Sequence, residues 1–288
     1  MASTLQPFIS WSTLMLSGAD GGTKSNYHER GKLAAMKLRR YALLATMVVV
    51  VGLLAPLRTQ AEEKSGLGLL TGADTPLREN ERISFIGDSI TMQGGFIQLM
   101  REAIARSDQT KDLGVQLFQY GLNGGRVDTI VGGVTPWGKQ DPFSTLLEKD
   151  KPTVVVIFLG VNDVTHGDAV SPEAFEKGLG KLVSEAKQSG AMVTLATPAV
   201  AGEKHDGTNP QDAKVDQYAS ISRKVAAANQ VVSCDLRKAF IEYLKKGNPE
   251  NKPRGVLTYD GIHMSPQGNA LLANEFARSI VDTLAKRK

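Results

Sequence analysis

The stretch FIGDSITMQGG, residues 85–95, places a serine directly after an apolar run. A serine hydroxyl is a poor nucleophile at neutral pH unless a neighbouring base removes its proton during the attack. Near the other end of the chain, the stretch YDGIHMSPQG contains Asp260 and His263 three residues apart. At that spacing the carboxylate can accept a hydrogen bond from one imidazole nitrogen, and the other nitrogen can act on Ser89. The three residues are therefore candidates for a catalytic nucleophile, base and orienting carboxylate.

Acyl transfer also needs hydrogen-bond donors for the oxyanion that develops on the substrate. Gly124, in YGLNGG, lets a carbonyl oxygen approach its backbone N–H, and Asn162, in GVND, offers a neutral side-chain donor. With the N–H of Ser89 itself they would supply three donors. We therefore predict that Gly124 and Asn162 contribute to an oxyanion hole.

Five short apolar runs rich in β-branched residues alternate with segments of helical period. Uninterrupted runs of this kind suit strands that are buried on both faces of a parallel sheet. Ser-Pro pairs at 171–172 and 265–266 are typical of helix starts, and apolar residues recur at helical spacing after them. The alternation predicts one doubly wound α/β domain. The runs are ISFIG (83–87), VQLFQYG (115–121), VVVIFLG (154–160), MVTLATP (192–198) and VVSCDL (231–236).

A doubly wound sheet carries its functional groups in loops at the carboxyl ends of its strands. Ser89, Gly124 and Asn162 each follow one of the predicted strands. All three candidates therefore meet this requirement of the fold.

Four short blocks, GDSI at 87–90, the glycine of YGLNGG at 124, GVND at 160–163 and DGIH at 260–263, occur in the order of a known family. With them the sequence resembles the SGNH hydrolases, also called the GDSL esterase/lipase family. The resemblance implies a flavodoxin-like three-layer α/β/α sandwich with a five-stranded parallel sheet. It also implies hydrolysis of carboxylic esters without a metal or cofactor. The same roles follow from it: Ser89 as nucleophile, Gly124 and Asn162 as oxyanion donors, and His263 with Asp260 as base and carboxylate partner.

Two positions depart from the family's pattern. Ile90 stands where leucine is common, and Gln119 stands where an asparagine often opens the second block. The second departure leaves Gly125 as an alternative to Gly124. The order Ser, Asp, His is shared with α/β-hydrolases, but no serine here has glycine at both −2 and +2, which disfavours that family.

Each block also has a purely structural interpretation. Gly-Asp-Ser can be an ordinary turn, Asn162 can form an Asx turn with its neighbour, and two adjacent glycines can make a tight bend. Asp260-Gly261 between apolar residues is a hairpin signal. Only three residues separate it from the Ser265 helix start, however, which leaves almost no second strand.

Three other residues and the histidines have candidate roles of their own. Asp88 is expected to hold the Ser89 loop by accepting backbone hydrogen bonds and not to be catalytic. Trp137, in a long connection after the second strand, either stacks on a sugar or acyl group or packs against its own domain. Cys234 is the only cysteine, so no intrachain disulfide can form, and its apolar surroundings predict a buried side chain. The four histidines show no metal-ligand spacing, so no zinc site is expected.

Residues 36–61 have the layout of a secretory signal peptide, with a basic start, an apolar stretch over 41–55 and small residues near Ala61. We expect translation to start at Met36, which makes residues 1–35 a non-translated or disordered extension, and cleavage after Ala61. An uncleaved membrane anchor is the alternative. Residues 62–80 are expected to be a polar tether before the hydrolase domain, 81–288. A cleaved signal peptide would place the protein in the periplasm or outside the cell.

The charge of the chain is unevenly distributed. The first 61 residues hold seven Lys and Arg against two Asp and Glu, whereas the remainder holds 27 against 28. A nearly neutral body gives no electrostatic reason to expect a nucleic-acid partner. The expected partner is an ester substrate, and the oligomeric state is left open.

The sequence predicts an exported serine esterase that works through an acyl-enzyme. O-acetyl groups of polysaccharides are the first candidate substrates, and a lysophospholipid or other lipid ester is the second. The same residues would also serve an acyltransferase. A non-catalytic carbohydrate-binding protein on this fold is the alternative class, while a nucleotide binder is disfavoured because no glycine-rich phosphate motif is present.

Overall fold

The computed structural model describes residues 65–166 and 170–287. The predicted extension (1–35), the signal peptide (36–61) and the first three residues of the predicted tether lie outside the described residues. The rest of the tether and nearly all of the predicted hydrolase domain are described.

Five parallel strands form one sheet in the order β2-β1-β5-β6-β7. The register pairs Gly87, at the end of β1, with Gly121 on one side and Phe158 on the other. The carboxyl ends of the three strands β2, β1 and β5 therefore lie at the same edge. All five strands predicted from the apolar runs are confirmed: β1 (Arg82–Gly87), β2 (Gln116–Gly121), β5 (Val154–Phe158), β6 (Met192–Ala196) and β7 (Val232–Cys234).

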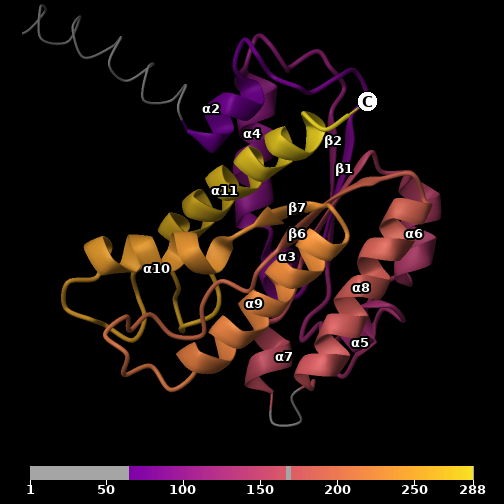
Figure 1. The fold of residues 1–288 in the computed structure, drawn as a ribbon. Helices are drawn as coiled ribbons and strands as arrows, with labels where there is room; N and C mark the ends of the chain where they lie inside the picture. The colour runs from indigo at the N-terminus through magenta and orange to yellow at the C-terminus, as the bar shows by residue number, and fades with distance from the viewer. Residues whose placement is uncertain (1–64, 167–169, 288) are drawn as a thin grey trace, which may run out of the picture. The chain divides into compact units, whose positions relative to one another are not determined.

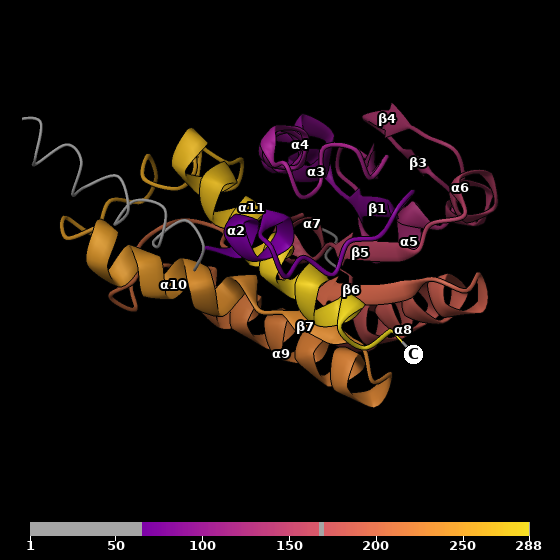
Figure 2. The ribbon, with the colours of Figure 1, turned by 90° about the horizontal axis from the view of Figure 1, so that it is seen from above.

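Helices cover both faces of this sheet, as Figures 1 and 2 show. Helices α4 (Gly95–Arg106) and α11 (Pro266–Leu284) pack together on one face, and α8 (Pro172–Gln188) and α9 (Asp212–Ala228) pack together on the other. The predicted three-layer α/β/α architecture is confirmed. The remaining helices and strands are α3 (Ser89–Gln93), α5 (Val127–Ile130), β3 (Val134–Thr135), β4 (Gly138–Lys139), α6 (Phe143–Asp150), α7 (Val161–Thr165) and α10 (Leu236–Gly247).

The two predicted Ser-Pro helix starts are confirmed. The Ser171 side chain accepts a hydrogen bond from the Ala174 N–H at the start of α8, and the Ser265 side chain accepts one from the Gly268 N–H at the start of α11. Each serine satisfies a backbone donor that has no intrahelical acceptor, which fixes the first turn. The apolar stripes that follow are buried against the sheet.

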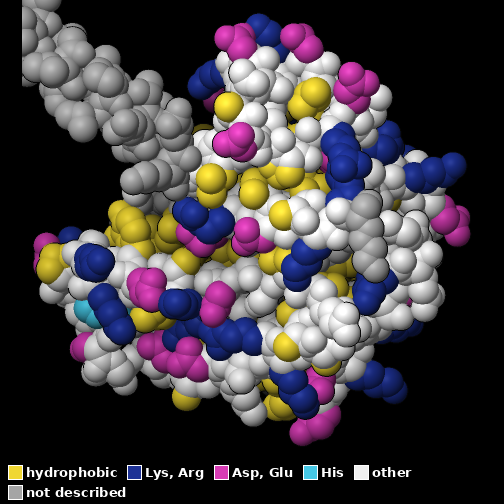
Figure 3. Space-filling model, turned by 45° about the horizontal axis from the view of Figure 1, so that its top comes forward, with side chains coloured by type: hydrophobic (Ala, Val, Ile, Leu, Met, Phe, Trp, Pro, Cys, Tyr) yellow, Lys and Arg dark blue, Asp and Glu magenta, His cyan; other side chains and the backbone are white. Residues whose placement is uncertain are grey.

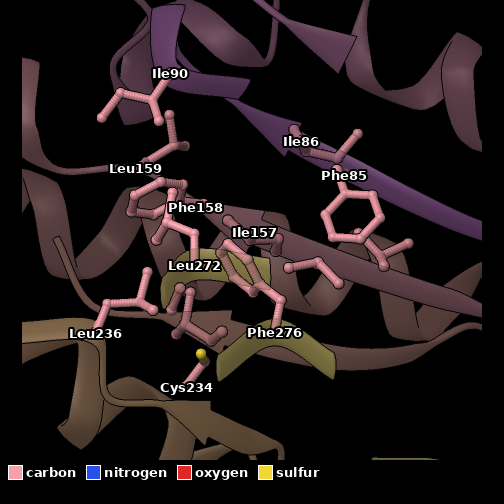
Figure 4. Packing of buried hydrophobic residues seen from close by; sticks show 14 of the residues in the cluster. Phe85, Ile86, Ile90, Ile157, Phe158, Leu159, Cys234, Leu236, Leu272 and Phe276 are labelled. Carbon is pink, nitrogen blue, oxygen red and sulfur yellow. The ribbon is translucent and has the colours of Figure 1, made fainter. Parts of the chain in front are cut away.

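Three phenylalanines join α11 to the middle of the sheet (Figure 4). The Phe276 ring lies edge-on to Phe85 on β1 and to Phe158 on β5, with ring centroids 5.9 and 5.5 Å apart. Such edge-to-face pairs add to the hydrophobic burial. Cys234 belongs to the same core, and burial raises its pKa to about 12, so the prediction of a buried cysteine is confirmed.

Residues 65–80 differ from the sequence prediction. The short helix α2 (Gly66–Thr71) packs on α11, and its Leu70 is fully buried. The absence of a side chain at Gly66 permits this approach, because a Cβ there would lie 1.8 Å from the Asn274 carbonyl oxygen. Leu77 is also buried. The expectation of a polar tether is therefore wrong for these residues, because two leucines within a mostly polar segment fix it to the domain.

The surface carries both signs of charge. Basic and acidic side chains are interspersed on the face that Figure 3 presents. Ion pairs between exposed groups, such as Lys224 with Glu176, contribute little to stability. None of the helices in the described ranges is long and apolar enough to cross a membrane.

Candidate active site

Ser89 lies at the junction of β1 and α3. It is the first residue of α3, so its backbone N–H has no intrahelical acceptor. The helix is capped by the buried Asp88, whose Oδ1 accepts the Ile90 N–H at 2.9 Å. The strand can end this closely against its neighbours because residue 87 is glycine: a Cβ there would lie 2.7 Å from the Phe158 carbonyl oxygen. Gly-Asp-Ser is thus a strand-to-helix junction rather than an ordinary turn.

Burial dominates the ionisation of Asp88. It raises the pKa of the carboxyl to about 7, although the Ile90 hydrogen bond and the charge of His263 act in the opposite direction. The predicted role of Asp88 in holding the Ser89 loop is confirmed by its hydrogen bond to Ile90.

The structure brings Ser89, His263 and Asp260 into one hydrogen-bonded chain. The Ser89 Oγ lies 2.9 Å from His263 Nε2, and His263 Nδ1 lies 2.7 Å from Asp260 Oδ2. A carboxylate oxygen accepts, so Nδ1 carries the proton and Nε2 is the acceptor that faces the serine hydroxyl. This geometry suits removal of the serine proton by the imidazole.

The Asp260 carboxylate also organises its own loop. Its Oδ1 accepts the backbone N–H groups of Ile262 and His263, at 2.9 and 2.8 Å. Partial burial would raise the pKa of Asp260, but the hydrogen bonds from His263 and Ile262 outweigh it and lower the pKa to about 2. Asp260 is therefore ionised at neutral pH. A single bridge, Thr258 with Met264, closes the loop, so no hairpin strands form here.

Gly124 and Asn162 come together beside the end of β2. Gly124 adopts φ +67°, and a Cβ there would meet the Trp137 ring at 2.3 Å, so only glycine fits this turn. Asn162, near the start of α7, donates its side-chain N–H to the Gly125 carbonyl at 3.1 Å. The amide nitrogen has a second hydrogen that remains for another acceptor. Asn162 is helical, so it does not form an Asx turn with its neighbour.

The backbone distinguishes the two glycines. Gly125 donates its N–H to the Leu122 carbonyl at 2.8 Å, so that group is already used in the turn. Gly124 N–H has no acceptor within the described part of the chain. Of the two, Gly124 is the donor that a substrate oxygen could use.

Asp163 ties the loop after β2 to the helix after β5. Its fully buried carboxyl accepts the Val127 N–H at 3.1 Å. Its second oxygen has no hydrogen-bond partner among the described residues, and burial raises its pKa to about 7. The GVND block marks Asp163 in the sequence without indicating a function for it; the structure makes it a residue that positions the Gly124 turn.

Glu203 is a buried residue that sequence reasoning missed altogether. Its carboxylate accepts the backbone N–H groups of Val256, Leu257 and Thr258 as well as the Thr258 hydroxyl. These donors directly precede the Asp260–His263 loop. No local pattern marks Glu203, because its partners lie 53 to 55 residues away in the chain.

The turn next to Glu203 docks on the catalytic loop as well. Gly202 N–H donates to the Gly261 carbonyl at 2.7 Å, and Glu203 N–H donates to the Pro253 carbonyl at 2.9 Å. Together these contacts fix residues 253–263, which contain no helix or strand. Within the ranges that the structure describes, no group of three or more His, Cys, Asp or Glu side chains is placed to hold a metal ion.

Comparisons with known proteins match both the chain and the fold. Residues 85–271 match the model of the GDSL-like lipase/acylhydrolase family. An acetylxylan esterase of Geobacillus stearothermophilus is 28% identical over 222 residues, 69% of this chain and 94% of that protein. An arylesterase of Vibrio mimicus is 26% identical over 58% of this chain and 76% of its own length. Among solved structures, the acetyl xylan esterase AlAXEase is 35% identical, with a TM-score of 0.59 over 67% of this chain and 96% of its own.

Proposed function

The chain belongs to the GDSL-like lipase/acylhydrolase family and is a carboxylic ester hydrolase, and we propose that it removes O-acetyl groups from polysaccharides outside the cytoplasm. The observation that carries the chemistry is the hydrogen-bonded chain from Ser89 through His263 to Asp260. We propose these three residues as nucleophile, base and orienting carboxylate.

In the acylation half, the Ser89 oxygen attacks the ester carbonyl carbon while its proton passes to His263 Nε2. The negative charge that develops on the carbonyl oxygen is stabilised by the N–H groups of Ser89 and Gly124 and by the Asn162 side chain. Such donors act most strongly when they are held in place before the charge forms. The bond to the leaving alcohol then breaks, and His263 gives its proton to that alcohol.

Deacylation repeats these steps with water as the nucleophile. His263 takes a proton from water as the water oxygen attacks the acyl carbon, and the Ser89 oxygen leaves and recovers that proton. Asp260 remains ionised and stabilises the imidazolium that forms twice in each cycle. The carboxylic acid and the original alcohol are the two products.

The choice of an acetylated polysaccharide rests on two supports. Two acetylxylan esterases, that of Geobacillus stearothermophilus and AlAXEase, resemble this chain over about two thirds of its length. A small pocket of about 110 Å³ adjoins Gly124 and is lined on one side by Trp137 and His166. Its aromatic and polar lining suits a sugar ring bound next to the site rather than a long acyl chain. The arylesterase relative supports a second candidate substrate, an aryl ester.

Initial rates of ester hydrolysis by the full-length chain test this proposal. We expect p-nitrophenyl acetate and acetylated xylan to be hydrolysed, p-nitrophenyl octanoate to be a poor substrate, and chelator to have no effect. Ser89→Ala should abolish the activity above the background left by the oxyanion donors, a loss of at least about 10³-fold. Ser220→Ala, on the exposed side of α9, is the matched control.

Each outcome bears on a different part of the proposal. An unchanged rate in Ser89→Ala would remove Ser89 as the nucleophile. Faster hydrolysis of the octanoate than of the acetate would overturn the short-acyl assignment in favour of a lipid ester. Transfer of acetyl to an added alcohol in preference to water would identify an acyltransferase.

Export is the part of the proposal that rests on the sequence alone. We propose that residues 36–61 direct the chain out of the cytoplasm and are then removed. Fractionation of cells expressing the full chain, followed by N-terminal sequencing of the product, tests this. A mature protein that begins at Glu62 would support cleavage after Ala61, and an intact chain held in the cytoplasm would contradict the proposal.

A further inference from the structure

Trp137 occupies the tip of a short hairpin beside the candidate active site. The hairpin consists of β3 and β4, and its turn is fixed by Thr135, whose hydroxyl accepts the Trp137 N–H and donates to the Asn123 carbonyl. One edge of the indole lies against the backbone at Gly124. Even so, 60% of the residue is exposed. Packing against the domain therefore accounts for only part of this large apolar side chain.

His166 supports the indole from the other element of the site. The two rings are stacked, with centroids 5.2 Å apart and planes at 29°. His166 follows α7 directly, and both its backbone N–H and its Nδ1 contact the Asn162 carbonyl oxygen, at 3.2 and 3.1 Å. The stacked pair is thus attached to both proposed oxyanion donors, to Gly124 through Trp137 and to Asn162 through His166.

Most of the large apolar side chains that the described residues expose belong to segments near the candidate site. Of the five large hydrophobic residues that the described chain exposes, Met92 belongs to the helix of Ser89, Val134 and Trp137 to the hairpin, and Tyr259 directly precedes Asp260. Leu69 on α2 is the exception. Four of the five thus belong to segments that carry or adjoin the candidate site, and Trp137 is the one that lines a pocket there.

The pocket beside the stacked rings is mixed in chemistry. It is lined by Gly124, Arg126, Thr129, Thr135, Trp137 and His166, with Pro136 at the turn. An aromatic face bordered by hydroxyl and guanidinium groups matches a sugar, whose ring has an apolar C–H face and a rim of hydroxyl groups. A plain acyl chain would not use the polar groups.

Building on the proposed function, we propose that Trp137, backed by His166, is the platform on which a pyranose ring of the substrate stacks. The ring would lie against the indole with its acetyl group directed past Gly124 towards Ser89. Trp137 then selects for an acetylated sugar over a simple acetate ester and acts mainly through binding. The attachment of the platform to Gly124 and Asn162 sets its position relative to the oxyanion donors.

Intrinsic fluorescence tests the platform without any turnover. The chain has two tryptophans, so Trp11→Phe in the full-length protein leaves Trp137 as the only tryptophan. Titration with unacetylated xylohexaose should produce a saturable change in emission with a shift to shorter wavelength, because the sugar covers the indole. Lys139→Ala, an exposed position on the same hairpin but outside the lining of the pocket, should give the same titration. No change up to the solubility of the sugar would overturn the proposal.

Steady-state kinetics distinguish a role of Trp137 in binding the sugar from a role in packing against Gly124. In Trp137→Ala the KM for acetylated xylohexaose should rise about tenfold, as for the loss of one aromatic anchor, with a much smaller change in kcat. Trp137→Phe should recover most of this loss. An equal fall in kcat in both variants, with KM unchanged, would show that Trp137 only supports the oxyanion turn. Because the fluorescence titration needs no catalysis, it still reports on the platform even if Ser89→Ala retains activity.

Discussion

The two sides of the candidate active site are held in place by different means. Ser89 lies where a buried strand turns into a helix, and regular structure sets its position: Asp88 caps the helix through Ile90, and Gly87 lets β1 pack closely against β5. Asp260 and His263 lie in a segment without helix or strand, between α10 and α11. That segment depends on Glu203, which lies more than 50 residues away.

This difference teaches where the site is vulnerable. The sheet and the first turn of α3 position Ser89, so a substitution near Ser89 moves it only if it also disturbs the packing of the core. The base is positioned by a few hydrogen bonds to one buried carboxylate and by the Asp260 side chain. Single polar substitutions should therefore affect the base side far more than the nucleophile side.

The largest expected effect within this comparison is that of Asp260→Asn. The asparagine amide would donate a hydrogen bond to His263 Nδ1, and this favours the tautomer in which Nε2 carries the proton. In that tautomer Nε2 cannot accept the proton of the Ser89 hydroxyl. We expect kcat for p-nitrophenyl acetate to fall by about 10³–10⁴-fold with little change in KM. Asp206→Asn, an exposed aspartate in the segment after Glu203, is the control. A loss of less than tenfold would mean that Asp260 does not orient the base.

A smaller loss is expected from Glu203→Gln, which changes no group in contact with Ser89, Asp260 or His263. The amide retains one acceptor oxygen, whereas the carboxylate now accepts four hydrogen bonds. Replacing hydrogen bonds to a buried charge should lower the free energy of unfolding by about 2–4 kcal/mol. We expect kcat to fall about 10- to 100-fold at temperatures where the variant remains folded, because the loop no longer holds His263 in place.

Two measurements distinguish positioning from simple instability in this variant. Urea unfolding gives the stability, and the kcat and KM of the folded variant give the function. Glu102→Gln, at a half-buried position on α4 far from Asp260 in sequence, serves as the matched control. If Glu203→Gln lost stability but kept full kcat below its unfolding transition, the hydrogen bonds to Glu203 would serve stability alone. The proposed difference between the two sides of the site would then be wrong.

The sequence patterns that predicted correctly were local ones. Buried parallel strands appear as uninterrupted apolar runs, and Ser-Pro pairs mark helix starts through hydrogen bonds to the first turn. Ser89, Gly124 and Asn162 could be expected to meet because each follows a strand of one sheet. The segment 65–80 escaped prediction because its polar composition hid the few residues, Leu70 and Leu77, that fix it.

The residues that position the base could not be predicted in this way. Glu203 contacts a loop that is remote in sequence and has no repeating pattern, so no spacing connects the two. The sequence does not distinguish packing from ligand binding for Trp137, because it cannot show that only one edge of the ring is covered. Long-range contacts between irregular segments are set by the assembled fold, and they decide how precisely the catalytic groups are held.

The smallest expected effect comes from the nucleophile side, through Asp88→Asn, and it has the opposite sign. Asp88 accepts the Ile90 N–H, and burial raises its pKa to about 7 from an ordinary value of 3.8. A carboxyl whose pKa is raised by folding stabilises the native state most at low pH, and this contribution is lost as the pH rises to about 7. The asparagine variant has no carboxyl to titrate at this position and so does not lose this contribution. The free energy of unfolding of the variant, relative to that of the wild type, should therefore rise by roughly 1–3 kcal/mol from pH 5 to pH 8. Urea unfolding of both proteins at pH 5 and pH 8 measures the difference. If Asp88→Asn were less stable than the wild type at pH 8, as Glu203→Gln should be, then both buried carboxyls would stabilise the native state through their hydrogen bonds, and the two sides of the site would not differ in this respect.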